Sequence, residues 1–414
     1  MAALAIAAWQ VHRWAVNVPY WDDFDGFLDF LIRIGDAASL REKLAISAEF
    51  HNEHRTLTTR LLTWAAHAGL GAPMDFRVLT LVAAGLFVPI AAVFVFTFPT
   101  RLERCLAAAM AGAFLFSLQH HEVLFWGGAC EHVSSVFFAV FALLALQRPG
   151  RWSLATGLLL ALAAAFTLAH GFVVFLAGAI MLCLQRRWRD AMIVAAVLVV
   201  AAGLWMIGYH GNPAHGTLQP TLQQARAILW FWFGMLGTPL AYGQRWVAPW
   251  LGIGVLAVTA ACFLAAGWRD RLYHLGVVLY ALGASLLIAV GRTPVDPHIF
   301  TGSRYRLLTC LVLATTGVLL GAILRRVRPA WRAEWILAAL ALAYAAEKTS
   351  AHWNRGRQLH ERLMAAARYY AAHHTLHGAP TELYYDLPKA ERILAESRRR
   401  GIHDLAAVGR QPAP

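Results

Sequence analysis

The sequence predicts an all-α integral membrane protein with about eleven transmembrane helices. Three observations support this fold class. Hydrophobic residues make up 59% of the chain and charged residues only 14%, which is well outside the balance of soluble globular domains. Several apolar runs approach the roughly 20 residues that a helix needs to cross the hydrocarbon core. These runs lack the apolar–polar alternation of transmembrane β-strands, so helices are the predicted spanning elements.

The candidate spans divide into a first helix and ten later runs. Residues 1–14 are apolar but carry no basic segment, so they do not match a secretory signal peptide. We expect them to be the end of a first helix that runs outward. Some later runs are short, and we expect flanking aromatic or polar residues to extend these helices to the length of a span. In chain order these runs are 76–98, 105–118, 133–147, 153–169, 171–184, 191–209, 247–266, 275–290, 307–324 and 333–347.

Short arginine-rich loops predict the orientation in the membrane. Lys and Arg in short loops stay on the cytoplasmic side, so the amino terminus is predicted inside and the carboxyl terminus outside. The chain then divides into a bundle, 1–347, with an outer catalytic loop at 12–75, and a small extracytoplasmic tail, 348–414. With their immediate neighbours, the loops hold 13 arginines and three carboxylates, and they are 101–104, 148–151, 186–189, 269–271 and 325–332.

One further apolar stretch, 226–241, tests this topology. If it crossed the membrane, the basic residues of 269–271 and 325–332 would move to the outer face. We therefore predict a re-entrant or interfacial element, broken at Gly234, Gly237 and Pro239.

The net charge of +13 does not indicate nucleic-acid binding. Thirteen of the 36 basic residues lie in the inner loops, where they orient helices and meet anionic lipid. The five cysteines show no paired spacing, so neither a disulfide framework nor a zinc site is predicted.

The clearest candidate for a catalytic site is the acidic segment 18–29. It carries Asp22, Asp23, Asp25 and Asp29, four carboxylates in eight residues beside the bilayer. Charges this close repel one another and are costly to dehydrate, which suggests that they bind a cation or a proton, or deprotonate a hydroxyl. The alternative is a solvated loop whose aspartates cap a helix. We predict that Asp22 and Asp23 are catalytic and that Asp25 binds substrate.

The segment 49–55 of the same loop supplies further candidates. His51, Glu53, His54 and Arg55 are predicted to bind substrate, because histidines with an arginine suit a phosphate. Histidine and carboxylate also occur together in metal sites, but the spacing does not match that of zinc peptidases. The sequence therefore does not decide whether a divalent cation binds here, and it identifies no ligands for one. The remaining alternative is a structural role in which these residues hydrogen-bond the loop to the bundle.

Charged residues at the mouths of two later helices form a third group. The stretch 119–131 has the pattern of a helix break that faces the outer space, and it contains His120, His121 and Glu122. Uncompensated charge is costly at the membrane, so functional use is the default interpretation. We predict that these three residues bind substrate; the alternative is a hydrogen-bonded network at the helix ends.

A late basic segment completes the candidate site. Arg292, Arg304 and Arg306 lie on the predicted outer face, contrary to the inward bias of basic residues, so they need a partner. Planar guanidinium groups suit a phosphate or a carboxylate, and Tyr305 is suited to anchor at the interface. We predict that all four bind substrate; the alternative is anchoring and pairing between helices.

These features together resemble the bacterial GT-C-type glycosyltransferases, polytopic membrane enzymes that take a sugar from a polyprenyl-phosphate carrier. The resemblance covers the bundle architecture over most of the chain and rests on the aspartate pair after the first helix and on Ser303-Arg304-Tyr305. It implies that Asp22, with Asp23 beside it, is the catalytic base or a metal-associated carboxylate, and that Arg304 contacts the lipid phosphate. The chain departs from the family in its Asp-Asp-Phe-Asp motif and in the absence of a large carboxyl-terminal domain, which leaves donor, acceptor and metal dependence open.

The predicted function is inverting transfer of a sugar from polyprenyl phosphate to a hydroxyl of a glycan, lipid or protein acceptor, on the extracytoplasmic side of the bacterial inner membrane. General base help contributes about 10²–10⁴-fold, and preorganised cations stabilise the leaving phosphate. The main alternative is a multi-pass transporter or lipid flippase, because ionisable residues and broken helices also serve substrate pathways. An oligosaccharide ligase or polymerase would rely more on the outer arginines and histidines. A purely structural protein would leave the outer clusters unexplained.

Overall fold

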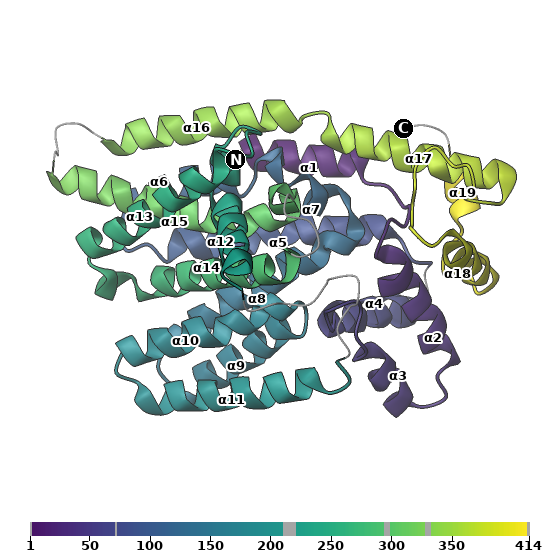
Figure 1. Ribbon diagram of the computed structural model, residues 1–414, viewed down its shortest axis with the longest axis horizontal. Coiled ribbons are helices and arrows are strands. Elements are labelled where there is room, and N and C mark those ends of the chain that lie inside the picture. Colours follow the sequence, from purple (N-terminus) through teal and green to yellow (C-terminus); the bar gives the residue numbers. More distant parts are fainter. Residues whose placement is uncertain (1, 71–72, 210–220, 294–298, 328–332, 412–414) are drawn as a thin grey trace.

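The computed structural model describes residues 2–70, 73–209, 221–293, 299–327 and 333–411. Within these residues the chain is helical, and the β-structure is limited to one isolated bridge between His51 and His54. Most of the long helices run roughly along the longest axis of the molecule (Figure 1). They share a continuous core of buried apolar side chains. The predicted all-α class is confirmed.

Every predicted span coincides with a helix. Six helical segments are long and apolar enough to cross a membrane, namely Phe76–Phe96, Gly127–Gln147, Trp188–Met206, Ala248–Ala266, Trp268–Arg292 and Ser303–Val327. The helices at the predicted spans are α1 (Ala2–Trp14), α5 (Phe76–Phe96), α6 (Arg101–Phe114), α8 (Cys130–Gln147), α9 (Arg151–Ala165), α10 (Val173–Leu184), α11 (Trp188–Met206), α13 (Ala248–Ala266), α14 (Leu272–Arg292), α15 (Arg306–Val327) and α16 (Ala333–His352).

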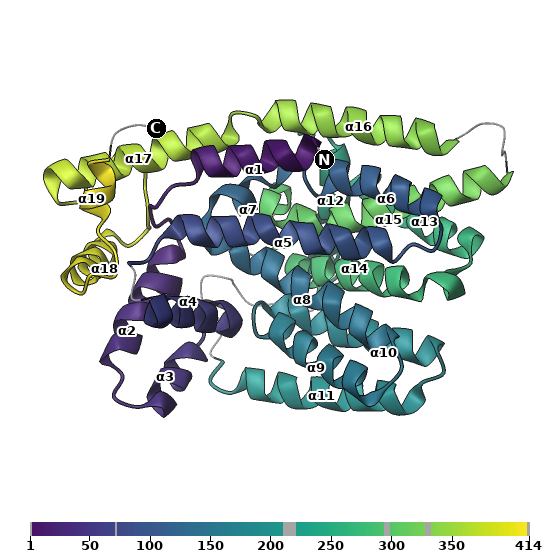
Figure 2. The same cartoon turned by 180° about the vertical axis from the view of Figure 1, so that it is seen from behind.

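The helices of the first loop and of the tail gather at one end of the bundle, on the right in Figure 1 and on the left in the reverse view of Figure 2. From the first loop come a single π-helical turn (Phe24–Asp29), α2 (Phe30–Asp36), α3 (Leu40–Ser47) and α4 (Leu57–Leu70). The tail contributes α17 (Arg355–His373), α18 (Leu387–Arg399) and α19 (Leu405–Gly409). Another short helix, α7 (His121–Phe125), follows α6 and precedes α8 in the chain.

The tail packs on the first loop and completes this end of the molecule. The backbone N–H of Trp21 donates to the carbonyl oxygen of Leu383 at 2.7 Å, and that of Met74 donates to Ile402 at 2.6 Å. These bonds place the tail against both ends of the first loop.

The arginine-rich loops lie at the other end. The α10–α11 and α13–α14 junctions and the facing ends of α15 and α16 are together there in both views (Figures 1 and 2). Arg271 and Glu103 form a buried ion pair at 2.5 Å that joins two of these loops. Arg187 donates to the carbonyl oxygen of Leu146 at 2.7 Å and joins two others. In the fifth loop, residues 328–332 lie outside the described residues.

The apolar stretch 226–241 belongs to α12 (Leu222–Gly237). This helix continues through Gly234, where the sequence predicted a break, and ends at Gly237 before a short turn that contains Pro239. It packs tightly against α13. The backbones are so close that a Cβ atom added at Gly252 of α13 would overlap the carbonyl oxygen of Phe233 of α12. Small residues permit this close backbone approach between membrane helices.

This contact predicts a difference between two glycines of α13. Gly252→Ala should lower the thermal unfolding midpoint of the detergent-solubilised protein, because overpacking costs about 1–3 kcal/mol. Gly254→Ala is the matched control, since a Cβ atom there has nothing within 4 Å. Equal midpoints for the two variants would show that α12 and α13 do not pack in this way.

Candidate functional site

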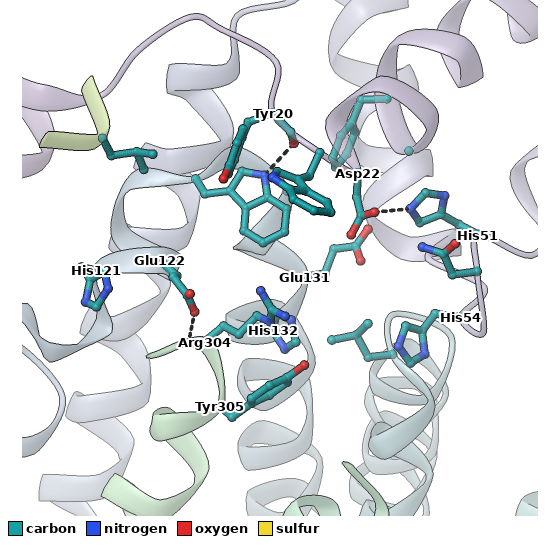
Figure 3. Close-up of a pocket in the computed structure, with 18 of the residues that line it drawn as sticks. Tyr20, Asp22, His51, His54, His121, Glu122, Glu131, His132, Arg304 and Tyr305 are labelled. Atoms are coloured by element: carbon teal, nitrogen blue, oxygen red, sulfur yellow. Dashed lines mark hydrogen bonds and ion pairs between the residues drawn. The ribbon is translucent and has the colours of Figure 1, made fainter. Parts of the chain in front are cut away.

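A cavity of about 840 Å³ lies at the end of the bundle where the first loop and the tail meet. Its walls come from the first loop, from the segment around α7, from the last residue of α14, from the turn before α15 and from α17. This volume lies in the range typical of small-molecule sites. Figure 3 shows many of the side chains that line it.

Nine of the fourteen predicted site residues line this cavity. They come from four segments that are far apart in the sequence, and they are Asp22, His51, Glu53, His54, His121, Glu122, Arg292, Arg304 and Tyr305. The other five, Asp23, Asp25, Arg55, His120 and Arg306, do not line it.

Asp22 presents its carboxylate to the cavity from the start of the π-helical turn. The preceding residue, Trp21, has the left-handed backbone angle φ 50°, which L-residues adopt at a cost. The Asp22 side chain is 48% exposed, and its Oδ1 atom lies 3.7 Å from Nε2 of His51 (Figure 3). Burial opposes ionisation, but His51, with Arg304 and Arg292 nearby, outweighs it and lowers the pKa of Asp22. Asp22 is therefore a carboxylate at neutral pH.

Asp23 lies behind the cavity wall. Its side chain is buried, and its Oδ2 atom accepts a hydrogen bond from the backbone N–H of Tyr20 at 2.9 Å. The Nε1–H of Trp126 donates to the carbonyl oxygen of Tyr20 at 3.0 Å. Burial, reinforced by the charge of Asp22, raises the pKa of Asp23 well above its usual value. These contacts fix the loop that presents Asp22.

A tight two-residue turn presents His51 and His54. Their backbones exchange hydrogen bonds at 2.7 and 3.0 Å, and Asn52 between them is left-handed at φ 51°. The next residue, Glu53, forms an ion pair with Arg292 at 2.6 Å, which attaches the turn to the end of α14. Burial opposes protonation of His51, but the Asp22 carboxylate outweighs it and raises the pKa of His51. The two groups therefore favour an ion pair.

Arg304 forms the opposite wall of the cavity. Its backbone N–H donates to Oε2 of Glu122 at 3.0 Å, while the backbone N–H of Glu122 donates to Oγ of Ser303 at 2.9 Å. The Arg304 guanidinium lies 5.8 Å from the ring centroid of Trp126 and 5.1 Å from that of Tyr305. Aromatic faces hold a cation without neutralising it, so the positive charge of Arg304 is kept for a ligand.

Like Asp23, the other four predicted residues outside the cavity have structural partners. His120 is buried, its Nε2 atom lies 2.7 Å from the carbonyl oxygen of Phe114, and burial lowers its pKa to about 4. Arg306 donates to the carbonyl oxygens of Gln119 at 3.3 Å and Thr301 at 3.0 Å. Both residues therefore hold helix ends together, the alternative that the sequence left open.

Arg55 and Asp25 also point to partners other than a ligand. Arg55 donates to the carbonyl oxygen of Trp205 at 3.0 Å, at the end of α11. Asp25 accepts from the hydroxyl of Tyr384 and forms an ion pair with Lys389 at 2.7 Å, which ties the loop to α18.

Sequence reasoning missed the contribution of the tail. Arg355, Gln358, Leu359 and Arg362 of α17 line the cavity, as does Tyr385. Their spacing of three, four and seven residues is the signal that one helix face carries them. The same spacing is typical of any amphipathic helix, so it does not single out a site without the fold.

Carboxylates and histidines are frequent in the cavity, but they are dispersed. Within the described ranges, no group of three or more His, Cys, Asp or Glu side chains is arranged to hold a metal ion. No family model, no curated protein and no solved structure matches this chain. The function of this protein is therefore inferred from the residues that line the cavity and from their geometry.

The bond between Asp25 and the tail predicts a local change. Asp25→Asn should speed amide hydrogen exchange in 387–399 about fivefold, because a partly exposed ion pair with Lys389 contributes about 1 kcal/mol. Asp75→Asn is the matched control, because Asp75 pairs with Arg77 of its own helix. Unchanged exchange in both variants would mean that Asp25 does not hold α18.

Proposed function

We propose that this protein is a membrane glycosyltransferase that moves a sugar from a polyprenyl-phosphate carrier to an acceptor hydroxyl. The observation that carries the proposal is the pairing of unlike groups across one cavity. Asp22, an accessible carboxylate held by His51, faces the space that Arg304 and Arg292 also line. Such a cavity offers a base and cations to one reaction.

The proposed reaction divides the work between these two groups. Asp22 accepts the proton of the acceptor hydroxyl as its oxygen bonds to the anomeric carbon of the sugar. The bond between that carbon and the phosphate oxygen breaks, and the carrier phosphate leaves with the electron pair. Arg304 and Arg292 stabilise the charge that develops on the phosphate. Attack opposite the leaving group inverts the anomeric centre.

The low pKa of Asp22 sets the character of the base. A carboxylate of this kind is weak but is already ionised at neutral pH, and general base help of about 10²–10⁴-fold does not need complete proton transfer before attack. His51 orients the carboxylate, and Asp23 positions its backbone through Tyr20. We therefore assign catalysis to Asp22 and positioning to Asp23.

The location of the cavity favours an enzyme over a transporter or flippase. Transporter sites lie near the middle of the membrane, at the interface of repeats. Here the lining residues come from helix ends, from the first loop and from the tail. We infer a chain of about eleven crossings in the bacterial inner membrane, with the arginine-rich loops in the cytoplasm and the cavity on the extracytoplasmic side.

Substitution of the base tests the proposal. Asp22→Asn should reduce release of polyprenyl phosphate at least about 100-fold, because the amide cannot accept the hydroxyl proton. The assay uses purified protein in lipid nanodiscs with a panel of polyprenyl-phosphate hexoses and pentoses labelled in the sugar. Asp270→Asn, the same change at an exposed site in the α13–α14 junction, should keep full activity. Full activity of Asp22→Asn, or no turnover of any donor by the wild type, would refute the assignment.

The pH profile tests the Asp22–His51 pair. Because the pKa of Asp22 lies below the ordinary 3.8, activity should persist as the pH falls and be lost only below that value. His51→Gln removes the contact that lowers this pKa, so the acid limb of the profile should move to higher pH. His12→Gln, at an exposed histidine of α1, should leave the limb in place. An acid limb that does not move in His51→Gln would show that the pair does not control the base.

A further inference from the structure

One face of α17 forms a wall of the cavity. Arg355, Gln358, Leu359 and Arg362 all line it, and positions i, i+3, i+4 and i+7 share one side of a helix. The two arginines are about 10 Å apart along the axis, because seven residues each rise about 1.5 Å. The wall is therefore cationic at both ends.

Neither of these arginines is neutralised by a carboxylate among the residues that the structure describes. Within the described ranges, Arg355 and Arg362 have no ion pair, and the one hydrogen bond of Arg362 is from its Nε to the carbonyl oxygen of Gln358 at 3.3 Å. Two other arginines nearby are paired, Arg292 with Glu53 at 2.6 Å and Arg357, on another side of α17, with Glu361 at 3.8 Å. An unpaired guanidinium in a concave site is suited to a phosphate or carboxylate.

Two histidines lie beside Arg355, and both are neutral at neutral pH because burial lowers their pKa. His121 lines the cavity here and stacks on His352, with ring centroids 5.3 Å apart. Burial, together with the charges of His352, Arg306 and Arg355, lowers the pKa of His121 to about 3. Arg355 is also the first residue of α17, and the side chain of Asn354 before it does not cap the helix. The amino-terminal end of a helix carries a partial positive charge, which favours an anion near Arg355.

The arginines of α17 belong to a different element from the groups assigned to the leaving phosphate, which come from the end of α14 and the turn before α15. In Figure 3, Glu122 and Arg304 lie between His121 and the pair formed by Asp22 and His51. The donor brings one phosphate, which Arg304 is placed to bind next to Asp22, with the paired Arg292 beside it. A second cationic region in the same cavity needs a second anionic group.

We infer that the acceptor itself is anionic, and that Arg355 and Arg362 of α17 bind its phosphate or carboxylate group. This inference rests on the proposed function, because it assigns one anion to the donor and the other to the acceptor. It places the acceptor along α17, with its hydroxyl toward Asp22. Neutral sugars and alcohols would then be poor acceptors.

A binding experiment with two anions tests the inference. The protein in phosphatidylcholine nanodiscs is saturated with decaprenyl phosphate and titrated with inorganic pyrophosphate by calorimetry. Pyrophosphate should still bind, because its site differs from that of the carrier phosphate. Arg355→Gln/Arg362→Gln should weaken this binding at least about tenfold while decaprenyl phosphate binding is retained. Arg357→Gln/Arg368→Gln, with the same loss of charge on residues of α17 that do not line the cavity, should leave both unchanged.

The outcomes separate this inference from the proposed function. Displacement of pyrophosphate by decaprenyl phosphate, or no pyrophosphate binding while the carrier binds, would overturn the second anion site and leave the glycosyltransferase proposal standing. Failure of decaprenyl phosphate to bind would overturn the proposed function and, with it, the acceptor role of α17. Adding phosphatidylglycerol to the nanodiscs identifies the source of the anion: competition assigns it to a lipid headgroup, and unchanged affinity to a soluble acceptor.

Discussion

The ion pair between Arg292 and Glu53 is the contact on which the arrangement of the cavity most depends. It joins the last residue of α14 to a two-residue turn of the first loop at 2.6 Å. That turn presents His51, and His51 in turn faces Asp22. Charges at the edge of an apolar bundle are costly unless they are paired. Arg292 is therefore stable at the end of α14 only when the first loop places Glu53 beside it. The requirement to pair one cation thus positions a carboxylate from another part of the chain.

Much of the fold could be predicted because hydropathy is a local property. A long apolar run in a bilayer forms a helix because its backbone polar groups must be satisfied within the segment, and every predicted span coincides with a helix. The path of α12 was harder to predict. Gly234 and Gly237 suggested a break, but α12 continues through Gly234 because glycine is accommodated where another backbone or ring comes close, here the ring of Phe300. Whether a glycine ends a helix or admits a neighbour depends on contacts that the sequence does not display.

The site could be predicted in part. Residue type indicated which side chains are costly to leave unpaired, and the fold brings nine of them to one cavity. The direction of each side chain was not visible. Arg55 and Arg306 are the same residue type as Arg304, yet they donate to carbonyl oxygens at helix ends. The face of α17 was missed for the opposite reason, because each of its residues is ordinary and only the fold makes them neighbours of Asp22.

The contact of the tail with the first loop has a consequence for biosynthesis. Tyr384 binds Asp25, a residue 359 positions earlier in the chain, and Tyr385 beside it lines the cavity. The aspartates are therefore synthesised well before the segment of the tail that completes their cavity. A nascent chain at the translocon therefore lacks a closed site, and a prematurely terminated product would insert its helices without acquiring one.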